Sequence, residues 1–130
     1  MKHVGIEEWL CSVRDLNKEL ESIHKEIDFF VRYKNYVGNP DKKISALTQR
    51  AVFIMQQKVL MADIVWNIKD PIARIIFRCR YILGYTWGDI AKNHAHQSER
   101  NVHLIHKRTL PEVEELYRRF VLVNEERSGE

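Results

Sequence analysis

Apolar residues recur along the first third of the chain at alternating intervals of three and four. They are Ile6, Trp9, Val13, Leu16, Leu20, Ile23, Ile27 and Phe30. This spacing is typical of the seam of a coiled coil, with charged residues between the apolar ones. The pattern predicts one helix from about Gly5 to about Tyr36. Because a narrow apolar seam needs a partner, we expect its residues from Trp9 to Phe30 to mediate oligomerisation.

A dense cluster of helix-breaking residues, Gly38-Asn39-Pro40-Asp41, follows this helix. A second periodic segment runs from Ile44 to Ile68 and has a broader apolar surface than the first. The two segments predict an antiparallel helical hairpin over residues 1–69. The pattern leaves open whether the hairpin closes within one chain or between chains. It also leaves open whether the extra apolar face of the second helix meets the C-terminal part or another subunit.

The stretch from residue 70 to 110 predicts three short helical elements. Asp70-Pro71 is a helix start, because Asp caps a first turn and Pro needs no N–H there. Gly84 is a plausible helix end, and Thr86 is the next capping candidate. A short helix of about seven residues, a polar break at 93–97 and a helix beginning at Ser98 complete the layout of a helix-turn-helix.

The end of the chain is expected to be less regular. Leu110-Pro111 predicts that the preceding helix ends or bends, and the glutamates that follow suit the first turn of a further helix. The helix-turn-helix unit is therefore assigned to residues 70–123, and residues 124–130 to a flexible tail. The expected fold class is all-α.

The helix beginning at Ser98 carries the candidate chemistry. Val102, Ile105 and Thr109 are spaced to face a core, which leaves polar and basic side chains, including His106, on or near the outer face. Arginine can bond guanine in a bidentate way, and lysine reaches phosphates. The alternative from pattern alone is an ordinary helical hairpin whose charges are solvated.

The segment from Arg80 to Ala91 (RYILGYTWGDIA) resembles that of RinA/ArpU-type phage late transcriptional regulators, which carry a sigma-factor region-4-like helix-turn-helix. The segment from Ser98 to Leu110 (SERNVHLIHKRTL) resembles their recognition helix. The resemblance covers about a third of the chain and implies sequence-specific binding of double-stranded DNA. It implies that the DNA-binding residues are Thr86, Ser98, Glu99, Arg100, His103, Leu104, Lys107 and Arg108.

Two features depart from that family pattern. The turn between Ala91 and Ser98 is one residue longer, and Asn93-His94-Ala95-His96 replaces an apolar residue expected near position 94. Pro111 interrupts a helix that usually continues. A relative that has lost DNA binding and now binds protein therefore stays a competing interpretation.

Composition and charge narrow the classes of protein to which the chain can belong. The chain has 130 residues, 45% hydrophobic and 30% charged, with 21 Lys and Arg against 18 Asp and Glu. The formal charge of +3 permits nucleic-acid binding without demanding it. No apolar run suits a membrane span, and early glutamates argue against a signal peptide, so we expect a cytoplasmic protein of a bacterial host. The two cysteines fit reduced buried thiols.

Catalysis has little support, because there is no Gly-rich phosphate loop and no serine with an evident base. Four histidines between residues 94 and 106 invite a metal site, but no carboxylate or cysteine completes a ligand pattern, so neither metal nor cofactor is expected. We expect a homodimeric regulator of phage or prophage genes, with RNA polymerase or another host protein as a further partner. The alternatives are a small terminase-like DNA-packaging protein and a helical protein-interaction protein.

Overall fold

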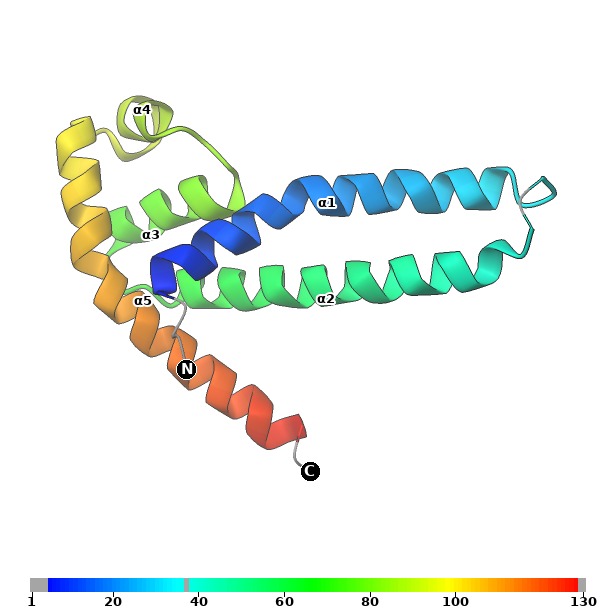
Figure 1. Cartoon of the computed structure of the whole chain (residues 1–130). Coiled ribbons are helices and arrows are strands. Elements are labelled where there is room, and N and C mark those ends of the chain that lie inside the picture. The colour runs from blue at the N-terminus through cyan, green and yellow to red at the C-terminus, as the bar shows by residue number, and fades with distance from the viewer. Residues whose placement is uncertain (1–4, 37, 129–130) are drawn as a thin grey trace.

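The structure is a computed structural model that describes residues 5–36 and 38–128, with side chains described as far as residue 122. The described part is all-helical, as predicted. Its α-helices are α1 (Ile6–Arg32), α2 (Pro40–Trp66), α3 (Pro71–Phe77), α4 (Trp87–Asp89) and α5 (Glu99–Ser128). In Figure 1, α1 and α2 form a long antiparallel hairpin, and the other helices gather at the end opposite its tip.

The seam predicted on the first helix closes against α2 of the same chain. Val13 and Ile23 are buried, and Leu16, Leu20 and Ile27 are half-buried in the hairpin. Opposite the distal part of the seam, α2 contributes Leu47, Ala51 and Ile54. Within the chain the seam therefore contacts α2. The oligomerisation role predicted for these residues stays a prediction.

The two aromatic ends of the seam also have partners within the chain. The indole N–H of Trp9 donates to the Gln57 side chain at 3.3 Å, and its ring lies 4.8 Å from the ring of Tyr117 in α5. Phe30 is half-buried, with the Lys43 ammonium 5.4 Å from its ring centroid. Trp9 therefore joins the hairpin to the C-terminal helix, which the sequence pattern did not predict.

The hairpin helices differ slightly from their predicted limits. α1 ends at Arg32 rather than near Tyr36, and residues 33–36 form turns. α2 begins directly at Pro40, which fits the first helical position because proline has no N–H to satisfy. Asn39 precedes it in the left-handed conformation, with a φ of 47°. The cluster of helix-breaking residues thus turns the chain as predicted.

α5 corrects the prediction that Leu110-Pro111 ends the helix. It is continuous from Glu99 to Ser128 with Pro111 inside, and it changes direction part-way along (Figure 1). Proline removes one helical hydrogen bond, but Val113 and Leu116 beyond it are buried and anchor the following turns. Residues 124–128, predicted as a flexible tail, also belong to this helix, while residues 129–130 lie outside the described part.

One hydrophobic core extends from the base of the hairpin into the C-terminal helices. Leu10 of α1 and Ile64 of α2 share it with Phe77, Ile90 and Val102. The division predicted at residues 69 and 70 falls between α2 and α3, but the core does not divide there. The C-terminal helices are therefore held rigidly against one end of the hairpin.

Candidate nucleic-acid interface

The first element of the predicted helix-turn-helix begins and ends at the expected residues. The Asp70 carboxylate accepts a hydrogen bond from the backbone N–H of Ala73 at 3.2 Å, which caps α3. The helix continues as a π-helical segment, Arg78–Ile82. Gly84 then turns the chain with a φ of +77°, a conformation that glycine adopts without the strain a side chain would add.

The second element is longer than predicted. The Thr86 hydroxyl accepts a hydrogen bond from the backbone N–H of Asp89 at 3.2 Å, and α4 continues as a π-helical segment, Ile90–Ala95. Most of the predicted polar break at 93–97 is therefore helical, and the turn itself is at residues 96–98. A π-helical turn holds one residue more than an α-helical turn, which accommodates the extra residue noted in the sequence.

The third element is the N-terminal part of α5, and its inward face is as predicted. The Ser98 hydroxyl accepts a hydrogen bond from the backbone N–H of Asn101 at 3.0 Å. Val102, Ile105 and Thr109 are buried, and the Thr109 hydroxyl donates to the Ile105 carbonyl at 2.7 Å. α3, α5 and the segment 90–95 all contact one another, which is the packing that a helix-turn-helix requires.

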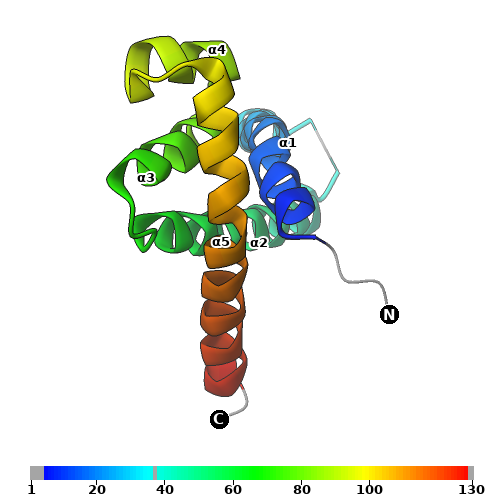
Figure 2. The ribbon, with the colours of Figure 1, turned by 90° about the vertical axis from the view of Figure 1, so that its left-hand side faces the viewer.

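The outer face of this part of α5 is uncovered. Arg100, Leu104 and Lys107 follow at intervals of four and three, opposite the buried residues, and all are exposed. In Figure 1 this helix forms one edge of the molecule, and in Figure 2 it lies in front of the other helices. A straight, exposed helical face at the end of the molecule has the shape that enters a major groove.

The remaining predicted DNA-binding residues flank this stripe. Glu99 and His103 are exposed on the side of α4, where the two side chains lie 3.9 Å apart and the His103 ring lies 4.6 Å from that of Trp87. Arg108 is exposed on the opposite side. Ser98 and Thr86 are exposed, but both hydroxyls are engaged as helix caps. The face therefore combines three permanent cations with one carboxylate.

His106 corrects the prediction that it lies on or near the outer surface. It is only 5% exposed, and its Nε2 lies 2.6 Å from the Tyr81 hydroxyl. Its ring stacks on Phe77 with the centroids 4.9 Å apart. Burial, together with the positive charges of His103 and Arg80, lowers the pKa of His106 to about 4. The neutral imidazole therefore joins α5 to the first element.

Arg80 positions the second element and was not singled out from the sequence. Its guanidinium lies 4.6 Å from the Trp87 ring centroid and donates to the Tyr85 carbonyl at 3.1 Å. The Trp87 ring also meets the His106 ring edge-on at 5.0 Å. The only signal in the sequence was the Arg80-Tyr81 pair shortly before Gly84, within the segment that resembles the phage regulators.

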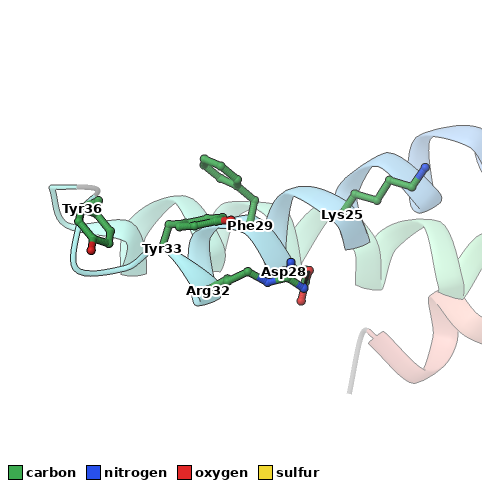
Figure 3. A pocket seen from close by; sticks show the side chains of 6 residues that line it. All are labelled: Lys25, Asp28, Phe29, Arg32, Tyr33 and Tyr36. Atoms are coloured by element: carbon green, nitrogen blue, oxygen red, sulfur yellow. Dashed lines mark hydrogen bonds and ion pairs between the residues drawn. The ribbon is translucent and has the colours of Figure 1, made fainter.

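A separate open hollow of about 610 Å³ lies at the tip of the hairpin, far from α5 (Figures 1 and 3). Exposed aromatic rings and an ion pair between Asp28 and Arg32 line it; its residues are Lys25, Asp28, Phe29, Arg32, Tyr33 and Tyr36. The Phe29 and Tyr33 rings are 5.1 Å apart and stabilise one another. The hollow is shallow and contains no buried polar side chain, so it is not the candidate site.

Other kinds of site find no support in the part of the chain that the structure describes. No group of three or more His, Cys, Asp or Glu side chains there is arranged to hold a metal ion. Among the same residues no helix combines the length and apolar character needed to cross a membrane. No protein-family model matches the chain, and neither a curated protein nor a solved structure matches it.

Proposed function

We propose that the chain binds double-stranded DNA through the outer face of the N-terminal part of α5 and regulates phage or prophage genes. One observation carries the proposal. Arg100, Leu104 and Lys107 form an exposed stripe on a helix whose opposite face, with Val102 and Ile105, is fixed in a three-helix core. A helix held by its buried face in this way can present its exposed side chains to base edges.

The residues on this face suit distinct tasks. Arg100 is the base-reading candidate, because a guanidinium can donate two parallel hydrogen bonds to guanine O6 and N7. Lys107 and Arg108 are candidates for phosphate contacts, which position the protein without reading sequence. Leu104, 55% exposed, offers an apolar contact to a thymine methyl group.

The regulatory role rests on the resemblance of residues 80–91 and 98–110 to RinA/ArpU-type phage regulators. Two observations support this role: the longer turn forms a π-helical segment that packs with the other two elements, and α5 continues through Pro111. The proposed activity is binding alone, and it assigns no catalytic residue. RNA polymerase is the proposed protein partner of a DNA-bound regulator.

Selection of bound fragments from a random duplex library at physiological salt tests this function. Enrichment of one motif supports the regulator. Weak sequence preference together with a mass well above that of a dimer would favour the terminase-like alternative. Absence of binding even at low salt would refute DNA binding and favour a protein-interaction role.

Two substitutions test the assigned face on the selected site. Arg100→Ala is expected to cost about 1–3 kcal/mol of binding free energy and to relax the preference at one base. Lys107→Ala is expected to weaken binding to all sequences and to reduce the slope of log K against log salt by about 1. Arg119→Ala removes a cation from the exposed C-terminal part of the same helix and is the matched control.

A further inference from the structure

α2 carries a second apolar stripe on an exposed face, which among the described residues is approached only at Trp66, where the Arg74 guanidinium lies 5.9 Å from the ring centroid. The stripe consists of Val52, Met55, Val59, Ala62 and Trp66, all of them exposed. Val59 is 59% exposed and Trp66 73%. The side of α2 that faces α1 uses different residues, among them Ala51 and Ile54. α2 is therefore apolar on two sides, and α1 covers only one.

The stripe has the spacing of a coiled-coil seam. Its intervals are three, four, three and four residues, so Val52, Val59 and Trp66 occupy a positions and Met55 and Ala62 occupy d positions of a heptad. A single helix gains nothing from such a regular exposed pattern, because it needs the matching seam of a second helix to bury it. Within parallel coiled coils, β-branched residues at a positions are typical of the two-stranded form.

We propose that a second copy of the chain covers this stripe, with the two α2 helices parallel and in register. In a parallel pair, a g residue of one helix faces the e residue five positions later on the other. Lys58 and Asp63 stand in that relation, and they are the only charged residues among the e and g positions between Ala51 and Val65. Among the described side chains neither has an ion-pair partner within the chain. In the proposed dimer Lys58 of each copy would therefore face Asp63 of the other, which gives two such pairs per dimer.

The size of the stripe also fits a dimer. With half to three quarters of each larger side chain exposed, the five residues present on the order of 500 Å². A stable interface buries about 800 Å² per partner, so the stripe supplies more than half of that area and residues that flank it, such as Gln56 and Asp63, would have to supply the rest. A nucleic acid or a strongly charged protein is a poor occupant, because the seam itself carries no charge.

The parallel orientation matters for the proposed DNA binding, and this part of the inference rests on that function. α5 lies at the end of α2 opposite the hairpin tip (Figures 1 and 2). A two-fold axis along α2 therefore places both recognition faces at the same end of the dimer, where one duplex can meet both. An antiparallel pair would place them at opposite ends.

Light scattering on the intact chain at tens of micromolar tests the dimer. Wild type is expected to have the mass of two chains. Val59→Glu, which replaces an exposed residue and so leaves the monomer folded, is expected to weaken dimerisation at least about a hundredfold by opposing like charges in the seam. Phe53→Glu changes a residue 47% exposed on α2 outside the seam, and its mass is expected to stay that of a dimer.

Exchanging the charges of Lys58 and Asp63 tests whether the two α2 helices are parallel. Lys58→Glu and Asp63→Lys are each expected to weaken the dimer several-fold, and the double variant to restore it, because the g–e′ pair is re-formed with reversed sign. In an antiparallel pair g residues face g residues and e residues face e residues, so wild type, both single variants and the double variant would all oppose like charges and dimerise about equally. Single variants that dimerise as tightly as wild type, or a double variant that does not recover, therefore overturn the parallel arrangement.

The outcomes separate this inference from the proposed function. A wild-type chain that stays monomeric, or a Val59→Glu variant that stays dimeric, overturns the α2 interface whatever the DNA result. If Val59→Glu disrupts the dimer but the wild-type dimer itself binds no DNA, the interface is upheld and the DNA-binding function is refuted. A Val59→Glu monomer that still binds a half-site, with lower affinity than wild type, supports both.

Discussion

The buried contact between His106 and Tyr81 makes the stability of the C-terminal helices depend on pH. In the folded chain the pKa of His106 is lowered to about 4, mainly by burial. In the unfolded chain it returns to about 6.5. Above that value both states hold a neutral imidazole, and His106 adds no pH dependence. As the pH falls from about 6.5 to about 4, the unfolded state binds the proton first, so the folded state loses stability.

The size of the effect follows from the two pKa values. At pH 4.5 the difference in protonation favours the unfolded state by about 2.5 kcal/mol relative to pH 7.5. That is a large share of the total stability of a small domain, typically about 5–15 kcal/mol. His106→Gln retains a hydrogen-bonding group near the Tyr81 hydroxyl but does not titrate. This variant is therefore expected to lack most of the acid destabilisation, although it starts from a lower stability at neutral pH because of lost ring stacking.

Urea unfolding followed by far-ultraviolet circular dichroism, from pH 7.5 to 4.5 at constant ionic strength, measures this difference. His24→Gln, on the exposed surface of α1, removes an imidazole without touching the buried pair and is expected to follow wild type. If His106→Gln loses stability between pH 6.5 and 4.5 as steeply as wild type, the buried neutral histidine is not the cause, and the reasoning fails.

Substitutions at three further positions test the local structure, each by the free energy of unfolding in urea. Asp70→Ala removes the side chain that caps α3 and is expected to cost about 1 kcal/mol, while Asp70→Asn retains the cap and much of that stability. Gly84→Ala places a side chain at a φ of +77° and is expected to cost about 1–2 kcal/mol through the backbone alone, since nothing lies within 4 Å of the new Cβ. Pro111→Ala restores a helical N–H within α5 and is expected to stabilise the chain by about 1 kcal/mol or more; a loss of stability instead would mean that the change of helix direction is needed for packing.

Much of the local structure could be predicted from the sequence, because the signals involved act over a few residues. Asp70, Thr86 and Ser98 cap helices as expected, since each offers an oxygen to an N–H three positions ahead. Gly84 ends its helix because it tolerates a left-handed backbone. The periodic spacing of Val102 and Ile105 likewise fixed which side of α5 faces inward, and with it the outer face that forms the candidate interface.

Contacts between residues far apart in the sequence determined the features that local sequence signals do not specify. Pro111 locally favours a helix end, but burial of the turns on both sides of it outweighs one lost hydrogen bond. Histidine is a polar residue, so the sequence alone suggests that His106 is exposed. Its burial is favourable because Tyr81 provides a hydrogen bond and Phe77 a stacking surface. The seam of α1 specified only that a partner helix was needed. Its closure on α2 of the same chain is a matter of three-dimensional packing, and it leaves the second stripe of α2 exposed in the part of the chain that the structure describes.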